Sequence, residues 1–124
     1  MARSIAPPRS MRVARLTVRL PTRMINDIQA DMSDNGYSPR NQSRWIEEAL
    51  VGLLESEYYP ELVAEDFIAH GRNKPVRITL NGETAHEIEK AIERIEHEEK
   101  LVDVQSKLVR TAIRSRLVAA GRGI

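Results

Sequence analysis

The stretch Arg12–Pro21, which reads RVARLTVRLP, decides how the rest of the chain folds. Apolar side chains at positions 14, 16, 18 and 20 alternate strictly with polar side chains at positions 15, 17 and 19. This period of two predicts a β-strand over about 12–20, with one apolar and one cationic face. Pro21 is expected to end it, because proline has no backbone N–H to donate. A lone strand is unstable, so we expect a partner strand and a helical layer.

Two helices are predicted after this strand. Thr22 begins the first, which ends near Asn35–Gly36 in the manner of a left-handed C-cap. Ser38 and Pro39 favour the N-cap and first position of a second helix that runs to about Glu57. Apolar residues recur at helical spacing in both helices and predict their buried faces. In the first helix these residues are Met24, Ile25, Ile28 and Met32. In the second they are Trp45, Ile46, Ala49, Leu50, Leu53 and Leu54.

The pattern then starts again. After a possible short helix over 60–69 and a polar, turn-rich segment over 71–75, Val76–Leu80 alternates like the first strand. Helices are expected over about 83–98 and from about Asp103 to Ala119, where Gly121 ends the last one. Gln42–Leu50 aligns with Gln105–Ile113, so the whole unit is repeated.

We therefore divide the chain into a disordered basic arm over 1–11, a first repeat over 12–57, a linker over 58–74 and a second repeat over 75–120. The predicted fold class is mainly α with a short two-stranded antiparallel β-ribbon, in the order βαα-linker-βαα. The linker has room for the short helix.

Positive charge is concentrated in two parts of a chain whose net charge is only +1. Residues 1–24 and 105–124 contain basic residues and no acidic ones, whereas the acidic residues gather over 47–66 and 83–99. Such a distribution can hold a polyanion locally, although an ordinary solvated surface is an equal alternative for the charges alone. No apolar run is long enough to cross a bilayer or to serve as a secretory signal.

The sequence offers no recognisable catalytic or metal site. It has no cysteine, and its histidines at 70, 86 and 97 do not have metal-ligand spacing. It also lacks a glycine-rich phosphate loop and the GxSxG and HExxH motifs. We therefore expect no enzymatic activity, no cofactor and no bound metal.

The repeated unit resembles the ribbon-helix-helix (MetJ/Arc) superfamily of DNA-binding proteins. The resemblance is carried by Arg15–Pro21, Asn35–Ser38 and Ser43–Leu50, and the same order recurs in the second repeat. In that family two strands, usually from two chains, pair antiparallel and enter the major groove. The resemblance implies that both copies lie in one chain here, as a tandem pseudo-dimer similar to the TraY-type proteins of conjugative DNA transfer.

The outward side chains of such a ribbon must be donors or acceptors that reach base edges. A major groove about 12 Å wide admits a two-stranded ribbon, and arginine and threonine suit base recognition. The residues expected to read bases are Arg15, Thr17, Arg19, Arg77 and Thr79. Pro75 occupies the position that matches Arg15 and cannot read a base, so we expect an asymmetric site in which the first strand reads more.

The resemblance also implies phosphate binding at the N-terminus of each second helix, where free N–H groups and the helix dipole attract anions. The matching segments are 38–43 and 102–106. Asp103 is a departure, because its carboxylate is expected to cap the helix but to repel phosphate. The residues expected to contact phosphate are Arg12, Ser38, Arg40, Asn41, Ser43, Lys74 and Ser106.

The expected function is that of a sequence-specific double-stranded DNA-binding protein. It would act as a transcriptional regulator such as a repressor, or as an accessory factor for plasmid or conjugative DNA transfer or partition. Further candidate partners are another copy of the chain on DNA and a relaxase or other DNA-processing protein, with no membrane involved. The expected location is the bacterial cytoplasm, on the nucleoid or a plasmid. The alternative is a protein-interaction module that uses the acidic helices and the segment 58–69.

Overall fold

The computed structural model describes residues 13–64, 72–99 and 103–122. The expected arm over 1–11 and Arg12 lie outside them. The elements in chain order are β1 (Val13–Pro21), α1 (Thr22–Asp34), a 3-10 turn η2 (Pro39–Asn41), α2 (Gln42–Leu54), α3 (Tyr59–Ala64), β2 (Asn73–Asn81), α4 (Gly82–Glu99) and α5 (Val104–Ala119). The described part is therefore mostly helical with one two-stranded antiparallel sheet, which confirms that part of the expected fold class.

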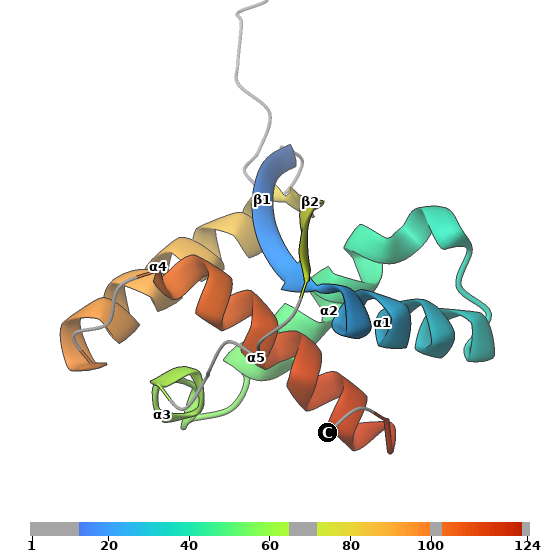
Figure 1. Cartoon of the computed structure of the whole chain (residues 1–124). Coiled ribbons are helices and arrows are strands. Elements are labelled where there is room, and N and C mark those ends of the chain that lie inside the picture. Colours follow the sequence, from blue (N-terminus) through green and yellow to red (C-terminus); the bar gives the residue numbers. More distant parts are fainter. Residues whose placement is uncertain (1–12, 65–71, 100–102, 123–124) are drawn as a thin grey trace, which may run out of the picture.

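β1 and β2 pair along their whole length, from Val13 opposite Asn81 to Pro21 opposite Asn73. Figure 1 shows this ribbon on one side of the molecule, above the crossing of α2 and α5, while α1 and α4 extend to opposite sides. Side chains alternate between the two faces of the ribbon, so one face covers the helices. The inner face contains the buried residues Val18, Leu20, Val76, Ile78 and Leu80.

The core lies between the inner face of the ribbon and the helices. α2 packs mainly against α5, and α3 contacts both α4 and α5. The predicted apolar faces are largely confirmed, because each helix turns its spaced apolar residues inward. The helical residues of the core are Ile28, Met32, Trp45, Ile46, Ala49, Leu50, Leu53, Val63, Ile88, Ala91, Ile95, Val104, Leu108, Val109, Ala112, Ile113 and Leu117. Met24, Ile25, Leu54 and Ile92 are only partly buried against it.

Each strand includes a proline that was expected to lie at its end or just outside it. Pro21 is the last residue of β1, and β2 begins at Asn73 rather than within the expected second repeat. The backbone N–H of Thr79 donates to the Ser43 side chain, away from β1. N–H directions alternate along an antiparallel strand, so odd-numbered residues direct this group away from the partner. Pro21 and Pro75 are therefore compatible with the ladder.

Two helices end in the same type of C-cap. After α1, the N–H of Gly36 donates to the Ser33 carbonyl (3.3 Å) and that of Tyr37 to the Met32 carbonyl (2.8 Å). Gly36 has a φ of +75°, so the predicted left-handed cap is confirmed. α5 ends likewise at Gly121, with a φ of +77°.

The second helix differs from its prediction at both ends. It begins with the 3-10 turn η2, in which Ser38 caps the Arg40 N–H, and it ends at Leu54 rather than near Glu57. The early end has a local cause. The Ser56 side chain accepts a hydrogen bond from the N–H of Tyr58, and such bonds compete with helix continuation.

We expect Gly36→Ala to lower the free energy of unfolding by about 1–2 kcal/mol, the cost of left-handed backbone for a residue with a Cβ. A Cβ at Gly36 meets no atom within 4 Å, so backbone conformation alone sets this cost. Gly52→Ala is the matched control, since Gly52 lies within α2 and its added Cβ also meets open space. It should raise stability by about 0.5–1 kcal/mol. Urea unfolding of both variants measures the difference, and equal midpoints would contradict the assignment of the cap.

Candidate nucleic-acid interface

The outer face of the ribbon consists of the odd-numbered residues that point away from the core. Six of them form three pairs, at every second position of the ladder, and we call each pair a level. The levels are Arg15 opposite Thr79, Thr17 opposite Arg77, and Arg19 opposite Pro75. All six are exposed except Thr79, which is half-buried. The structure therefore brings the five predicted base-reading residues onto one surface. Neither strand contains an acidic residue.

Each level has one arginine, and the arginines do not all come from the same strand. Arg15 and Arg19 belong to β1, whereas Arg77 of β2 lies opposite Thr17, between them. The Arg19 guanidinium donates to the backbone carbonyl of Asn73 at 3.2 Å, so it reaches across the ribbon toward β2. The result is a cationic surface with an arginine at each end and one in the middle.

The start of α2 is hydrogen-bonded to β2 at one end of the ribbon. The Ser43 Oγ accepts a hydrogen bond from the N–H of Thr79 (3.0 Å), and a Glu47 carboxylate oxygen accepts one from the N–H of Asn81 (2.9 Å). These bonds satisfy N–H groups that would otherwise lie open at the strand edge. Glu47 is absent from the predicted site, because no local pattern shows which distant strand a helix touches.

The other end of the ribbon is held by the start of α1. The backbone N–H of Thr22 donates to the carbonyl of Arg72 at 2.9 Å, and the Thr22 hydroxyl donates to the same carbonyl at 3.3 Å. The ribbon is therefore fixed to helices at both ends. Such support holds the outer face in one orientation relative to the helices.

The predicted phosphate-contacting residues of the first repeat gather around η2. Ser38 and Arg40 are exposed, Asn41 is half-buried, and all three precede or form the turn that begins α2. Ser43 lies in the first turn of α2 with its oxygen directed to β2. Its hydroxyl hydrogen is still a possible donor, so its phosphate role stays a prediction. Arg12 lies outside the described residues.

In the second repeat, the segment that corresponds to η2 and the start of α2 is the start of α5. A small cavity of about 230 Å³ lies there. It is lined by Arg19, Pro21, Asn73, Asp103, Ser106, Lys107 and Arg110. Ser106 therefore lies close to the end of β1, and its phosphate contact stays a prediction. Lys107, which the sequence analysis missed, lines the same cavity and could have been found as the cation one residue after Ser106.

Asp103 does not cap α5 with its side chain, so that expectation is wrong. Its backbone is left-handed, with a φ of +55°. A residue that caps a helix with its side chain normally has an extended backbone. From that conformation its side-chain oxygen reaches the N–H groups of the first helical turn. The left-handed conformation removes that geometry.

Lys74 is exposed but does not belong to the outer face. It lies opposite Leu20, which is fully buried on the inner face. Because paired residues share a face, Lys74 leaves the ribbon on the side opposite to Arg77. Its predicted phosphate contact would therefore have to come from the margin of the ribbon.

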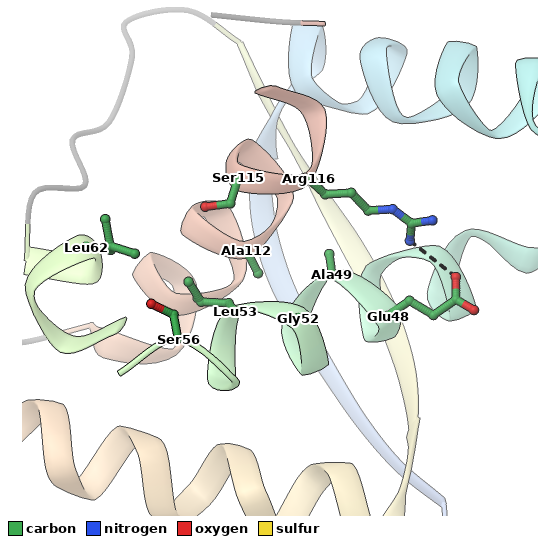
Figure 2. A pocket seen from close by; sticks show the side chains of 9 residues that line it. All are labelled: Glu48, Ala49, Gly52, Leu53, Ser56, Leu62, Ala112, Ser115 and Arg116. Atoms are coloured by element: carbon green, nitrogen blue, oxygen red, sulfur yellow. Dashed lines mark hydrogen bonds and ion pairs between the residues drawn. The ribbon is translucent and has the colours of Figure 1, made fainter. Parts of the chain in front are cut away.

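Figure 2 shows a pocket between α2 and α5. Its volume is about 420 Å³, and none of its lining residues belongs to β1 or β2. It is lined by Glu48, Ala49, Gly52, Leu53, Ser56, Leu62, Ala112, Ser115 and Arg116. Leu62 comes from α3, in the segment named by the alternative function. Pro60 and Val63 of α3 are buried and Tyr58 is exposed, whereas 65–69 lie outside the described residues. The described part of that segment thus packs against the helices through Pro60 and Val63, whereas Tyr58, Glu61 and Leu62 are exposed.

Arg116 connects four groups beside this pocket. Its guanidinium donates to the Trp45 carbonyl (2.7 Å), to Glu48 (3.2 Å) and to the Tyr37 hydroxyl (2.9 Å). It also lies 4.5 Å from the centre of the Trp45 ring. The Glu48 carboxylate accepts a further hydrogen bond from Tyr37. The bond from Tyr37 and then that from Arg116 hold the pKa of Glu48 below its ordinary value of 4.5, although partial burial opposes them.

We expect this cluster to contribute to acid sensitivity. The pKa of Glu48 is lower in the folded than in the unfolded chain, so its contribution to stability is complete above about pH 4.5 and is lost as the pH falls through the folded value. Glu48→Gln should be less stable at pH 7 but lose less stability than the wild type between about pH 5 and 3. Urea unfolding at a series of pH values tests this. Parallel pH profiles would contradict it.

Comparisons of the chain with protein-family models, with curated proteins and with solved structures find no match. Within the described residues, no group of three or more His, Asp or Glu side chains is arranged to hold a metal ion. None of the helices in that part of the chain has the length and apolarity that a membrane span needs.

Proposed function

We propose that the protein binds double-stranded DNA sequence-specifically by inserting the β1–β2 ribbon into the major groove. The observation that carries the proposal is the outer face, with one arginine at each of three successive levels and two threonines beside them. A two-stranded ribbon fits a groove about 12 Å wide, and these side chains match the donor and acceptor pattern of base edges there.

We also propose that the fold is a tandem ribbon-helix-helix pseudo-dimer. Its support is the regularity of the register. β2 runs from 73 to 81 and β1 from 13 to 21, so equivalent strand residues differ by 60 in number. The residues 17 and 77 are equivalent in this sense, and they also pair with each other at the middle of the ribbon. A two-fold axis through that pair would relate the strands, and α2 and α5 pack against each other beneath them.

The charge distribution favours one orientation on a polyanion. The two strands carry Arg15, Arg19, Lys74 and Arg77 and no acidic residue, whereas α4 alone contains seven glutamates among eighteen residues. Phosphates are attracted to the ribbon and repelled by α4. We propose that the bound protein acts as a transcriptional regulator or as an accessory factor for DNA transfer or partition.

Selection from a random duplex library, with the full chain, tests this function. We expect a short enriched motif that the protein binds far more tightly than a scrambled duplex of equal length at the same salt concentration. Salt titration of both duplexes provides the second measurement, because phosphate contacts alone give equal and steeply salt-dependent binding. Equal affinity for the two duplexes would reduce the protein to a nonspecific binder, and no binding to either would refute the proposal.

Arg15→Ala should weaken binding to the selected duplex by about 1–3 kcal/mol and relax its base preference. Lys90→Ala removes the same charge from the exposed side of α4 and serves as the control. It should leave affinity and preference nearly unchanged. Binding that survives alanine at both Arg15 and Arg19 would instead favour the protein-interaction alternative.

A further inference from the structure

We infer that the outer face reads three G·C base pairs in the spatial order Arg15, Arg77, Arg19, with the middle pair read by the second strand. The inference rests on the proposed function and adds which base pairs the site contains and which residue recognises each. It depends on the strand register, because Arg77 follows both other arginines in the sequence but lies between them in the ribbon.

The levels of the outer face give this order a length scale. Successive residues of an antiparallel strand rise about 3.4 Å, so neighbouring levels lie about 7 Å apart and the two outer arginines about 14 Å apart. Base pairs rise about 3.4 Å along B-DNA. The three arginines therefore cover a window of roughly five base pairs, and Arg77 faces its middle.

Arginine determines which base is expected at each level. Its guanidinium binds the N7 and O6 atoms of guanine with two hydrogen bonds, the commonest specific contact in the major groove. Neither β1 nor β2 supplies an acidic neighbour that would compete for the three arginines, but Asp103 lines the same cavity as Arg19. Each level is thus expected to prefer a G·C pair.

The two ends of the window are not equivalent. At the Arg15 level the opposite residue is Thr79, which can contact the neighbouring base as a donor or acceptor. At the Arg19 level the opposite residue is Pro75, which offers neither, and Arg19 already donates to the carbonyl of Asn73. The preference for G·C should therefore be stronger at the Arg15 end than at the Arg19 end.

The experiment repeats the random-duplex selection with three variants of the full chain, Arg15→Ala, Arg77→Ala and Arg19→Ala, beside the wild type and Lys90→Ala. All three arginines are exposed, and thermal unfolding checks that each variant is folded. Each variant should lose a preference of about 5- to 150-fold at one base pair only. The pair lost with Arg77→Ala should lie between the pairs lost with the other two, and Lys90→Ala should keep all three.

Two results would overturn the inference, and the first of them leaves the proposed function standing. In the first, an enriched wild-type motif is found but the position lost with Arg77→Ala lies outside the other two. In the second, each arginine variant weakens binding to all duplexes equally, which would make the arginines phosphate contacts and remove the support that the outer face gives to the proposed function. A wild-type protein that enriches no motif would overturn the proposed function as well.

Discussion

Ile78→Lys should abolish the cooperative fold. Ile78 is fully buried on the inner face of the ribbon, opposite Leu16, and belongs to the apolar core. An ammonium group placed there loses its hydration without gaining an opposite charge, which costs several kcal/mol. Because domains are stable by only about 5–15 kcal/mol, we expect no cooperative urea transition and a large loss of helical circular dichroism.

Thr17→Lys is the control for this substitution. It adds the same charge to the facing strand, one residue away from Leu16, but on the exposed outer face. Its free energy of unfolding should stay within about 0.5 kcal/mol of the wild-type value. Neighbouring residues of a strand lie on opposite faces, so a tolerated Ile78→Lys combined with a damaging Thr17→Lys would show that the opposite face of the ribbon covers the core.

Trp45→Ala should lower the free energy of unfolding by about 3–5 kcal/mol. The indole is completely buried, and its ring lies against the Arg116 guanidinium. Its Nε1–H also donates at 2.9 Å to Asp31, a carboxylate that is itself buried and that accepts a second bond from Arg122. One substitution thus removes core volume, a cation–π contact and a hydrogen bond to a charge.

Two variants separate these contributions. Trp45→Phe keeps an aromatic ring but loses the hydrogen bond to Asp31, so we expect a smaller loss of about 1–3 kcal/mol. Tyr58→Ala removes an aromatic side chain that is 67% exposed and should change stability by less than about 0.5 kcal/mol. Urea unfolding followed by circular dichroism measures all three. Equal losses for Trp45→Ala and Trp45→Phe would mean that the hydrogen bond, not packing, accounts for the effect.

The elements that the sequence predicted best are those governed by local rules. The alternation through Leu16–Leu20 fixes which side chains face the core, and the same holds for Val76–Leu80. Gly36 marks the end of α1 because only glycine adopts its backbone conformation easily. The boundaries that failed, at Asn73 and Leu54, depend on strand pairing and on a Ser56 side-chain bond, neither of which follows from residue spacing.

The candidate site was only partly predictable for a related reason. The alternation identifies which residues point outward, but it does not show which residue of β2 lies opposite which residue of β1. That Arg77 lies between Arg15 and Arg19 follows only from the register. The support that Ser43 and Glu47 give to β2 joins residues more than thirty positions apart, and no local pattern encodes it.

The two strands of the ribbon are encoded at separate places in one chain. In a ribbon built from two copies of a single strand, every substitution is made twice and changes both ends together. Here a change at Pro75 alters the partner of Arg19 and leaves the pair of Arg15 and Thr79 untouched. Under the proposed function, recognition at one end can therefore change by single substitutions while the other end keeps its side chains, a route that symmetric ribbons do not have.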